Sequence, residues 1–464
     1  MLNQPNSYPR RVAAFTLTIM AMMVLCGIRI YSSTRLGPTE FEERRRAYLE
    51  HLRSSSGMSG DILDRSGRKL ALDLRRADGR RDRIYPLAEA ASHVTGMITR
   101  YSPPLGIERW RVHGDIPNAS FYDVWLGDPV FSLGRTPDVK LTIDSGLQRE
   151  CFDALSREKC PGAILMMSFD GEILSMVSTP TWDPNLAVSP GNGEYRRSLD
   201  EHVLRNRALA PIAPASCIKP ILFLLSKKRG GWPDDFICDG VDVVAGQRIK
   251  CHATHGRIDW KSAIIHSCDP RSAALAVDDF TSLELNDAAK KLGFATTLVK
   301  GIGRVRGTPP DPSASAGKRA YVGIGNAIEV APLSLVRAYI AIANNGVAPE
   351  PSLIAGKAQT TERLFSQADA DSMAGVLRQV VKEGTAVGAR RWPIIGKTGT
   401  NRLHADPKEE QGGIFVWADP GARIAGIVVL EGTPGQPRRS RDAVKVVDKM
   451  YRDFVSSLPP ARQP

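Results

Sequence analysis

The sequence predicts an α+β fold in which an antiparallel sheet is flanked by helices and carries a helical subdomain. Two pairs of apolar strands predict the sheet. Residues 162–169 and 172–178 flank Asp170-Gly171, and residues 413–418 and 423–430 flank Asp419-Pro420-Gly421. Such turn residues between apolar runs are typical of hairpins. Because the chain between the two hairpins is mainly helical in pattern, strands from both ends of this segment are expected to share one sheet.

Four segments have the apolar spacing of helices that cover such a sheet, namely 142–155, 332–346, 366–383 and 443–454. Asp144 is placed to cap the first helix, and Pro332 stands in the first turn of the second. In the third, one face carries Met373, Val376, Leu377, Val380 and Val381. Gly384 follows that helix and is expected to close it.

The composition is that of an ordinary globular protein. Apolar residues make up 42% of the 464 residues and charged residues 24%, which excludes collagen, coiled coil, multi-span membrane protein and overall disorder. The net charge of +12 suits an anionic partner. The basic residues are scattered without a recognisable binding module, so nucleic acid is not the expected partner.

The N-terminal segment predicts a membrane anchor. Val12 to Ile28 is an uncharged run of 17 residues after Arg10 and Arg11, and with Arg29 at the interface it is long enough to cross a bilayer. No small-residue cleavage site follows the run, which favours an uncleaved anchor. The flanking arginines do not decide its orientation.

The sequence divides into four predicted parts. Residues 1–33 form a cytoplasmic tail with the transmembrane anchor, and 34–136 a small β-rich pedestal. Residues 137–456 form the main domain, and 457–464 a flexible tail. Within the pedestal, the highly charged residues 74–83 are expected to be a solvated loop.

Three short motifs carry the candidate chemistry. The first is Ser216-Cys217-Ile218-Lys219, where a helix beginning near the serine would bring the lysine amine within reach of its hydroxyl. The second is Ser267-Cys268-Asp269, and the third is Lys397-Thr398-Gly399-Thr400 after the short apolar run 392–396. S-x-x-K alone is common by chance. The three elements in this order are the signature of penicillin-binding proteins and class A β-lactamases.

With these motifs the sequence resembles a class B penicillin-binding protein of the elongation type, a membrane-anchored peptidoglycan D,D-transpeptidase. The resemblance extends over most of the chain: it includes Gly60 to Ala71, Leu105 to Glu108, Thr142-Ile143-Asp144, Leu147-Gln148, Asn206-Arg207-Ala208, Gly323-Ile324-Gly325, Pro332-Leu333, and the stretch with Cys238, Cys251, His255-Gly256 and Ser267-Cys268. It implies the transpeptidase fold shared by penicillin-binding proteins and serine β-lactamases.

The resemblance also implies roles for the motif residues. Ser216 would attack the penultimate D-alanine carbonyl of a stem peptide, with Lys219 accepting its proton, and Ser267 would relay a proton to the departing D-alanine. Lys397, Thr398 and Thr400 would hold the terminal carboxylate. Backbone N–H groups of Ser216 and Thr400 would form the oxyanion hole, and Gly399 would let the strand approach the substrate closely.

Two features depart from the family pattern. Asp269 stands where Asn is common, and a carboxylate there would favour the ammonium form of Lys219 and oppose its role as a base unless the proton passes onward. We interpret Asp269 as a mark of the elongation subtype and include it among the catalytic residues. The pedestal is also short for the family.

The cysteines leave several alternatives open. Cys151, Cys160, Cys217, Cys238, Cys251 and Cys268 are compatible with disulfides in an oxidising compartment, although no connectivity follows. The run Cys251-His252-Ala253-Thr254-His255 with Cys238 has zinc-ligand character, but its spacing fits no usual structural site, so disulfides or free thiols are favoured. Cys217 and Cys268 are expected to be small buried thiols, with a redox-sensitive cleft as the alternative. No metal or cofactor is expected, because the lysines perform the proton transfers.

The resemblance implies an enzyme that crosslinks stem peptides through a serine acyl-enzyme and is acylated by β-lactams. A D,D-carboxypeptidase and a serine β-lactamase are the alternatives, and a catalytically impaired membrane scaffold or sensor is a further one. Glu284-Leu285-Asn286 superficially resembles the β-lactamase deacylation element, but it lies within a predicted helix, 282–291. The expected location is the inner membrane, single-pass, with the catalytic domain on the periplasmic side. Expected partners are a SEDS-type glycosyltransferase and other cell-wall synthesis proteins.

Overall fold

The structure is a computed structural model that describes residues 15–26, 60–77, 81–98, 104–113, 138–189, 191–227, 236–356, 360–402, 411–433 and 435–457. The chain divides into two compact units. One comprises Met1–Met58 and Ser120–Thr136, of which a single helix at residues 15–26 is described. The other comprises Ser59–Ala119 and Pro137–Pro464 and contains the sheet and the candidate site.

The helix at residues 15–26 occupies the middle of the predicted anchor, whose two ends lie outside the described residues. Among the described helices, none reaches the length and apolar character that a membrane crossing requires. The predicted anchor therefore stays a prediction.

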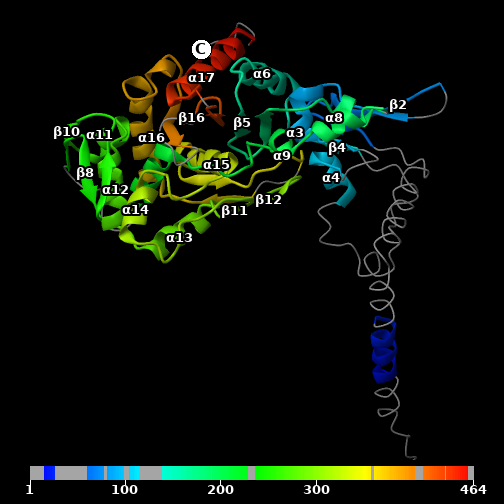
Figure 1. The fold of residues 1–464 in the computed structure, drawn as a ribbon, viewed down its shortest axis with the longest axis horizontal. Coiled ribbons are helices and arrows are strands. Elements are labelled where there is room, and N and C mark those ends of the chain that lie inside the picture. Colours follow the sequence, from blue (N-terminus) through cyan, green and yellow to red (C-terminus); the bar gives the residue numbers. More distant parts are fainter. Residues whose placement is uncertain are drawn as a thin grey trace, which may run out of the picture. The chain divides into compact units, whose positions relative to one another are not determined.

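The main unit is built on a five-stranded antiparallel sheet in the order β15-β16-β17-β5-β6 (Figure 1). Its strands are β5 (Gly162–Ser168), β6 (Ile173–Thr179), β15 (Ile395–Arg402), β16 (Gln411–Asp419) and β17 (Ile424–Leu430). Both predicted hairpins are confirmed, and β17 pairs with β5, so the two ends of the segment meet in one sheet. The third motif lies on the edge strand β15.

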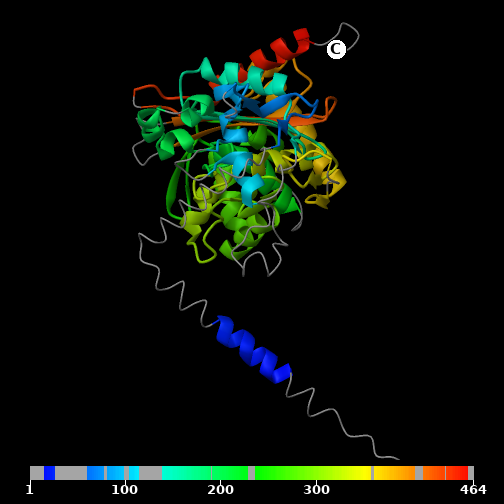
Figure 2. The same ribbon diagram turned by 90° about the vertical axis from the view of Figure 1, so that its right-hand side faces the viewer.

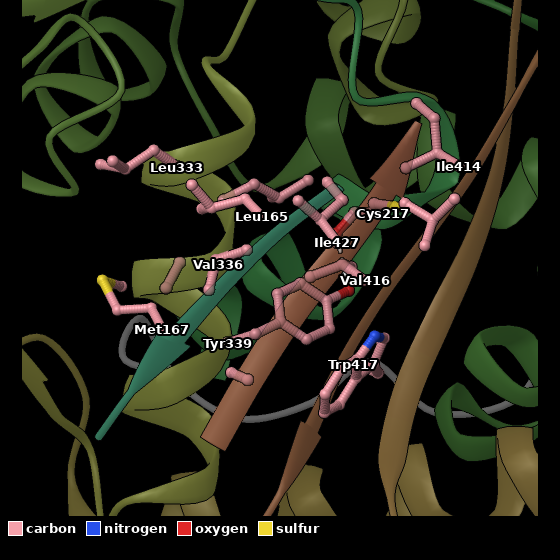
Figure 3. Packing of buried hydrophobic residues seen from close by; sticks show 14 of the residues in the cluster. Leu165, Met167, Cys217, Leu333, Val336, Tyr339, Ile414, Val416, Trp417 and Ile427 are labelled. Atoms are coloured by element: carbon pink, nitrogen blue, oxygen red, sulfur yellow. Dashed lines mark hydrogen bonds between the residues drawn. The ribbon is translucent and has the colours of Figure 1, made fainter. Parts of the chain in front are cut away.

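Helices cover both faces of this sheet. On one face lie α6 (Ser145–Ser156) and α17 (Ser440–Ser457), the latter red in both views (Figures 1 and 2). On the other face lies α15 (Pro332–Ala343), which is buried along its whole length and packs against β5, β16 and β17. Figure 3 shows Tyr339 of α15 beside Val416 of the sheet. Trp417, the next residue on β16, stacks edge-on against Tyr451 of α17 at 5.1 Å.

The predicted helices are confirmed with small shifts at their ends. Asp144 caps α6 by accepting hydrogen bonds from the backbone N–H groups of Gly146 and Leu147. The third helix, α16 (Gln367–Lys382), is capped by Ser366 and buries the predicted apolar face. It packs against β15 and thus supports the third motif.

A subdomain of short elements lies between the two hairpins and gathers around α11, α12 and α14 at one end of the unit (Figure 1). Its helices are η3 (Ala215–Ile218), α10 (Lys219–Lys227), α11 (Trp260–Ile265), α12 (Asp269–Asp278), α13 (Ser282–Lys291) and α14 (Ala316–Gly323). Its strands form two-stranded ladders: β7 (Phe236–Cys238) with β10 (Gly256–Ile258), β8 (Val241–Val244) with β9 (Gln247–Lys250), and β11 (Thr296–Val299) with β12 (Gly303–Arg306).

The remaining elements complete the main domain. They are α7 (Pro184–Val188), α8 (Gly193–Ser198), α9 (Glu201–Leu204), β13 (Val347–Pro349), β14 (Thr361–Arg363) and η4 (Val387–Ala389). Strand β13 pairs with β14 and also packs against α15.

The described part of the pedestal contributes three strands to a small sheet in the order β3-β2-β1-β4, whose strand β4 belongs to the predicted main domain. Its elements are β1 (Ile62–Leu63), β2 (Lys69–Arg75), β3 (Arg81–Ile84), β4 (Val139–Lys140), η1 (Ala88–Ala91), α3 (Ser92–Thr95) and α4 (Gly106–His113). The prediction of a solvated loop at 74–83 is wrong for its ends, which belong to β2 and β3. Arg83 is buried because its guanidinium donates to the Glu108 carboxylate at 2.7 Å.

Candidate active site

The turn that carries Ser216 is held from two sides. Ser216 lies in η3, and the backbone N–H of the preceding Ala215 donates to the Gly325 carbonyl at 3.2 Å. The buried Tyr339 hydroxyl donates to the carbonyl of Cys217 at 2.9 Å. These contacts fix the residues on both sides of Ser216, whose own side chain is half-exposed toward a groove.

Lys219 begins α10 and is fully buried. Its Nζ donates to the Ser267 carbonyl at 2.8 Å, to Ser267 Oγ at 3.3 Å and to Asp269 Oδ1 at 2.6 Å. Between the described side chains of Ser216 and Lys219 no hydrogen bond is formed, so the expected direct contact is absent from this conformation. The amine instead points at the second motif. Catalytic hydrogen bonds are often long before substrate binds.

Ser267 brings the three motifs together. It occupies the corner between α11 and α12 with a φ of +57°, and it is largely buried. Its Oγ accepts from Lys219 Nζ at 3.3 Å and from Lys397 Nζ at 2.9 Å. A single hydroxyl therefore connects the amines of the first and third motifs, which lie 178 positions apart in the sequence.

Lys397 lies on β15 with a fully buried side chain. Burial, together with the nearby Lys219 ammonium, lowers the pKa of Lys397 to about 7. Its amine donates to Ser267 Oγ and, at 3.2 Å, to the Thr398 carbonyl. Because Lys397 lies behind Ser267 and does not line the groove, this geometry favours proton transfer over direct contact with a substrate carboxylate.

The rest of the third motif forms one wall of the groove. A Cβ on Gly399 would stand 3.0 Å from Cys217 Sγ and 3.0 Å from the Pro214 carbonyl oxygen, so glycine permits the strand to run this close to the nucleophile turn. Thr398 Oγ1 lies 2.5 Å from Thr385 Oγ1. Thr400 accepts from the backbone N–H of Ser440 at 3.3 Å.

The groove has a volume of about 420 Å³. Its walls include Ser216, Ser267, Asp269, Thr398, Gly399 and Thr400. Arg248 and Lys250 of β9 also line it and give it positive charge suited to an anionic ligand. Sequence reasoning missed these two residues, as well as His252, Asn326 and Thr385. Three of these positions had a nearby signal: Thr385 follows Gly384 at the end of a predicted helix, Asn326 follows Gly323-Ile324-Gly325, and His252 lies in the run considered for zinc.

Glu284 lies outside this groove. It is the third residue of α13, and its carboxylate accepts from the backbone N–H of Thr281 at 2.8 Å in a capping box. The interpretation of its β-lactamase-like context as accidental is consistent with this structural use.

All seven cysteines are free thiols. Cys217 is buried and its Sγ donates to the Lys397 carbonyl at 3.4 Å, whereas Cys268 belongs to a group with Cys238, Cys251 and His255. Burial raises the pKa of Cys217 to about 12, so it is a poor nucleophile. In the described part of the chain, that four-residue group is the set of side chains able to hold a metal ion.

Comparison with known proteins gives a consistent assignment. The sequence model of the family "Penicillin binding protein transpeptidase domain" matches residues 162–453, more than half of the chain. The peptidoglycan D,D-transpeptidase MrdA of Acinetobacter baumannii is 29% identical over 305 residues, which is 58% of this chain and 45% of that protein. PbpA of Mycolicibacterium smegmatis, also named a peptidoglycan D,D-transpeptidase, is 24% identical over 365 residues, 70% of this chain and 73% of the relative.

Solved structures show the same fold. Penicillin-binding protein A from M. tuberculosis, in its penicillin G acyl-enzyme complex, superposes with a TM-score of 0.72 at 21% identity, covering 86% of this chain and all of that one. The family-model match over residues 162–453 includes both the sheet and the three motifs. The chain thus belongs to the penicillin-binding-protein transpeptidase family, as its class B resemblance predicted.

Proposed function

We propose that this protein is a peptidoglycan D,D-transpeptidase that works through an acyl-enzyme on Ser216 and is acylated there by β-lactams. The observation that carries the proposal is the placement of Ser267 Oγ between two buried amines, beside the groove that Ser216 lines. Buried amines joined through a hydroxyl can move a proton to and from a serine nucleophile.

The first step is attack of Ser216 Oγ on the penultimate D-alanine carbonyl of a stem peptide. Lys219 accepts the hydroxyl proton, and the peptide bond breaks as D-alanine leaves with a proton relayed by Ser267. Backbone N–H groups of Ser216 and Thr400 stabilise the oxyanion, a contribution for which loss of one donor typically costs about 10²- to 10³-fold in rate. The amine of a second stem peptide then attacks the ester carbonyl; the bond to Ser216 Oγ breaks, the proton lost by the amine returns to Ser216 Oγ, and the new amide is the crosslink.

The network of Lys219 also answers the difficulty raised by Asp269. The Asp269 carboxylate accepts a hydrogen bond from Lys219 Nζ at 2.6 Å, and Lys219 takes up the Ser216 proton during the attack. Ser267 Oγ gives that proton a route to Lys397, whose lowered pKa of about 7 leaves it able to accept one near neutral pH. Asp269 then orients Lys219 without blocking it.

Residues of β15 and β9 that line the groove hold the substrate. Thr398 and Thr400 bind the terminal carboxylate, and Arg248 and Lys250 attract the anionic stem peptide. We propose that the net charge of +12 matches anionic lipid head groups and wall polymer.

Two of the three alternatives are weaker, and the carboxypeptidase shares the same site. A serine β-lactamase needs a base for rapid deacylation, and Glu284 is engaged in capping α13. A D,D-carboxypeptidase would share every residue named above and differ only in accepting water. An inactive scaffold would have no use for two lysines buried around one serine, an arrangement whose desolvation is costly.

The location and the partners follow from the same proposal. The apolar run from Val12 to Ile28 supports a single-pass anchor in the inner membrane with the catalytic domain in the periplasm. A SEDS-type glycosyltransferase and other cell-wall synthesis proteins would supply the glycan strands whose peptides are crosslinked. Stem peptides and β-lactams are the proposed ligands of the groove.

The deciding experiment is intact mass after exposure to benzylpenicillin, with wild type and Ser216→Ala compared. We expect one covalent adduct on the wild type and none on the variant. An adduct on both proteins, or on neither, refutes the assignment of Ser216. Crosslinked dimers formed from a donor and an acceptor stem peptide then separate transpeptidase from carboxypeptidase activity.

A further inference from the structure

The two-stranded ladder of β8 and β9 forms part of the active-site groove. Arg248, Ile249 and Lys250 of β9 line the groove together with Ser216. The ladder packs against α12, the helix that begins at Asp269 of the second motif, and β8 lies beside that helix in Figure 1. The same helix therefore supports the second motif and this wall of the groove.

Alternation along β9 divides its side chains between two faces. Ile249 is buried in a small apolar cluster with Val244 of β8 and Ala273 of α12. Arg248 and Lys250 are exposed on the other face, and residues two apart on a strand stand about 6.4–6.8 Å from each other. Burial of Ile249 therefore keeps both cations on one side of the strand, where both line the groove.

Neither cation is neutralised within the described part of the chain. The side chains of Arg248 and Lys250 form no ion pair and no hydrogen bond with any described residue. Among the described residues that line the groove, Asp269 has the one carboxylate, and it is already paired with the buried Lys219. The groove thus carries two positive charges for which the described structure supplies no counter-charge.

The third motif already provides for one carboxylate of the ligand. In the proposed function, Thr398 and Thr400 of β15 bind the terminal carboxylate, and β15 belongs to a different sheet from β9. Two separate anion-binding elements in one groove fit a ligand with two separate carboxylates. A ligand with the terminal carboxylate alone would leave Arg248 and Lys250 unmatched.

The ladder also offers an apolar surface beside the cations. Val243 pairs with Arg248 and Val241 with Lys250, and opposed residues of an antiparallel pair point to the same side. The two valines are 68% and 37% exposed, respectively. An aliphatic side chain that ends in a carboxylate could therefore place its methylene groups on the valines and its charge on the cations.

We propose that Arg248 and Lys250 form a subsite for a second carboxylate of the donor stem peptide, carried on an aliphatic side chain N-terminal to the scissile bond. This inference rests on the proposed function, because it requires that the donor peptide acylates Ser216. A guanidinium can donate two parallel hydrogen bonds to a carboxylate, and the ammonium adds a second positive charge. A carboxamide at the same position has no negative charge, so the subsite selects donor peptides in which this group is not amidated.

A pair of penicillins isolates the second carboxylate. Carbenicillin is benzylpenicillin with an additional carboxylate on the acyl side chain, and this side chain stands where the peptide precedes the scissile bond. The second-order rate of acylation of the full chain is measured with each, and the ratio of the two rates removes effects common to both. Arg248→Gln should lower the carbenicillin-to-benzylpenicillin ratio by about tenfold, the lower end for hydrogen bonds to charged groups because the site is exposed.

Arg304→Gln is the matched control. Arg304 is exposed on β12 and lies outside the groove, so its removal changes the net charge equally without touching the subsite. The ratio of this variant should equal that of the wild type at the same ionic strength, whereas Arg248→Glu should lower the ratio further than Arg248→Gln. Equal ratios in wild type and Arg248→Gln, or an equal fall in Arg304→Gln, would overturn the proposal.

Synthetic peptides extend the test to the proposed substrate. Two stem peptides end in D-Ala-D-Ala and differ in one group, a carboxylate or a carboxamide on the side chain that precedes the two D-alanines. Release of D-alanine by the wild type should be about tenfold faster for the carboxylate, and Arg248→Gln should lose this preference. A wild type that uses both peptides equally would contradict the proposal.

The penicillin experiment separates this inference from the proposed function. If neither penicillin forms an adduct on Ser216, the proposed function fails and the inference fails with it. Adducts with both penicillins, at a ratio that Arg248→Gln leaves unchanged, would keep the proposed function and remove the subsite.

Discussion

Gly325→Ala tests how closely the nucleophile turn is held. Gly325 has a φ of +78°, and a Cβ there would lie 2.1 Å from the Ala215 carbonyl oxygen, roughly 1 Å closer than Cβ atoms approach other atoms. Alanine in this conformation costs about 1–2 kcal/mol. Relief of the overlap must move the turn that carries Ser216, since the obstructing atom is backbone.

We expect the free energy of unfolding to fall by about 2–4 kcal/mol, from the backbone strain and from overpacking together. Displacement of Ser216 by about 1 Å should lower the second-order rate of acylation by about 10²-fold. The rate would be measured with a fluorescent penicillin under conditions where urea titration shows the variant to be folded.

Gly375→Ala is the matched control. Gly375 is exposed within α16, and a Cβ there meets nothing within 4 Å. The substitution should raise the free energy of unfolding by about 1 kcal/mol and leave acylation unchanged. If Gly325→Ala acylates as fast as this control, the contact between Gly325 and Ala215 does not position the nucleophile, and the reasoning is refuted.

Three other predictions concern the proton network and the groove wall. The acylation rate of the wild type should rise with pH through about 7, because Lys397 is protonated below its pKa and can accept a proton above it. In Lys397→Arg this inflexion should disappear from the pH–rate profile. Asp269→Asn removes the partner of the Lys219 ammonium and should lower the free energy of unfolding by about 1–3 kcal/mol in urea titration, while acylation persists. Thr385→Val removes the hydrogen bond to Thr398 and should slow acylation by about three- to tenfold, and an unchanged rate would exclude Thr385 from the groove's function.

The sequence predicted the sheet and its covering helices because their signals are local. Asp144 caps α6 from one residue before the helix, and Gly171 with a φ of +88° closes the β5–β6 hairpin. A helix cap and a tight turn are each determined by one or two residues and their immediate neighbours in the sequence. The loop predicted at 74–83 failed for the opposite reason, since burial of Arg83 depends on Glu108, 25 residues away.

The motif residues were predicted, but their contacts were not. Helical spacing suggested that Lys219 would meet Ser216, whereas in the structure Lys219 Nζ donates to Ser267 and Asp269. That preference depends on how α11 and α12 dock against α10, which periodicity cannot specify. The same limit applies to Cys238, Cys251, His255 and Cys268, whose spacing matches no common zinc pattern because strand pairing and the α11–α12 turn bring them together.

Two of the seven described non-glycine residues with positive φ lie where the chemistry is proposed to occur. Ala215, next to the nucleophile, and Ser267 have φ values of +48° and +57°, a conformation that costs non-glycine residues about 1–2 kcal/mol each. Glycine would remove the strain at Ser267, but it would also remove the hydroxyl that joins Lys219 to Lys397. Ser267 therefore combines a strained backbone with a hydroxyl that the network requires. Two backbone hydrogen bonds hold this corner: the Ser267 N–H donates to the Ile264 carbonyl at 3.1 Å, and the Cys268 N–H donates to the Ala263 carbonyl at 2.8 Å.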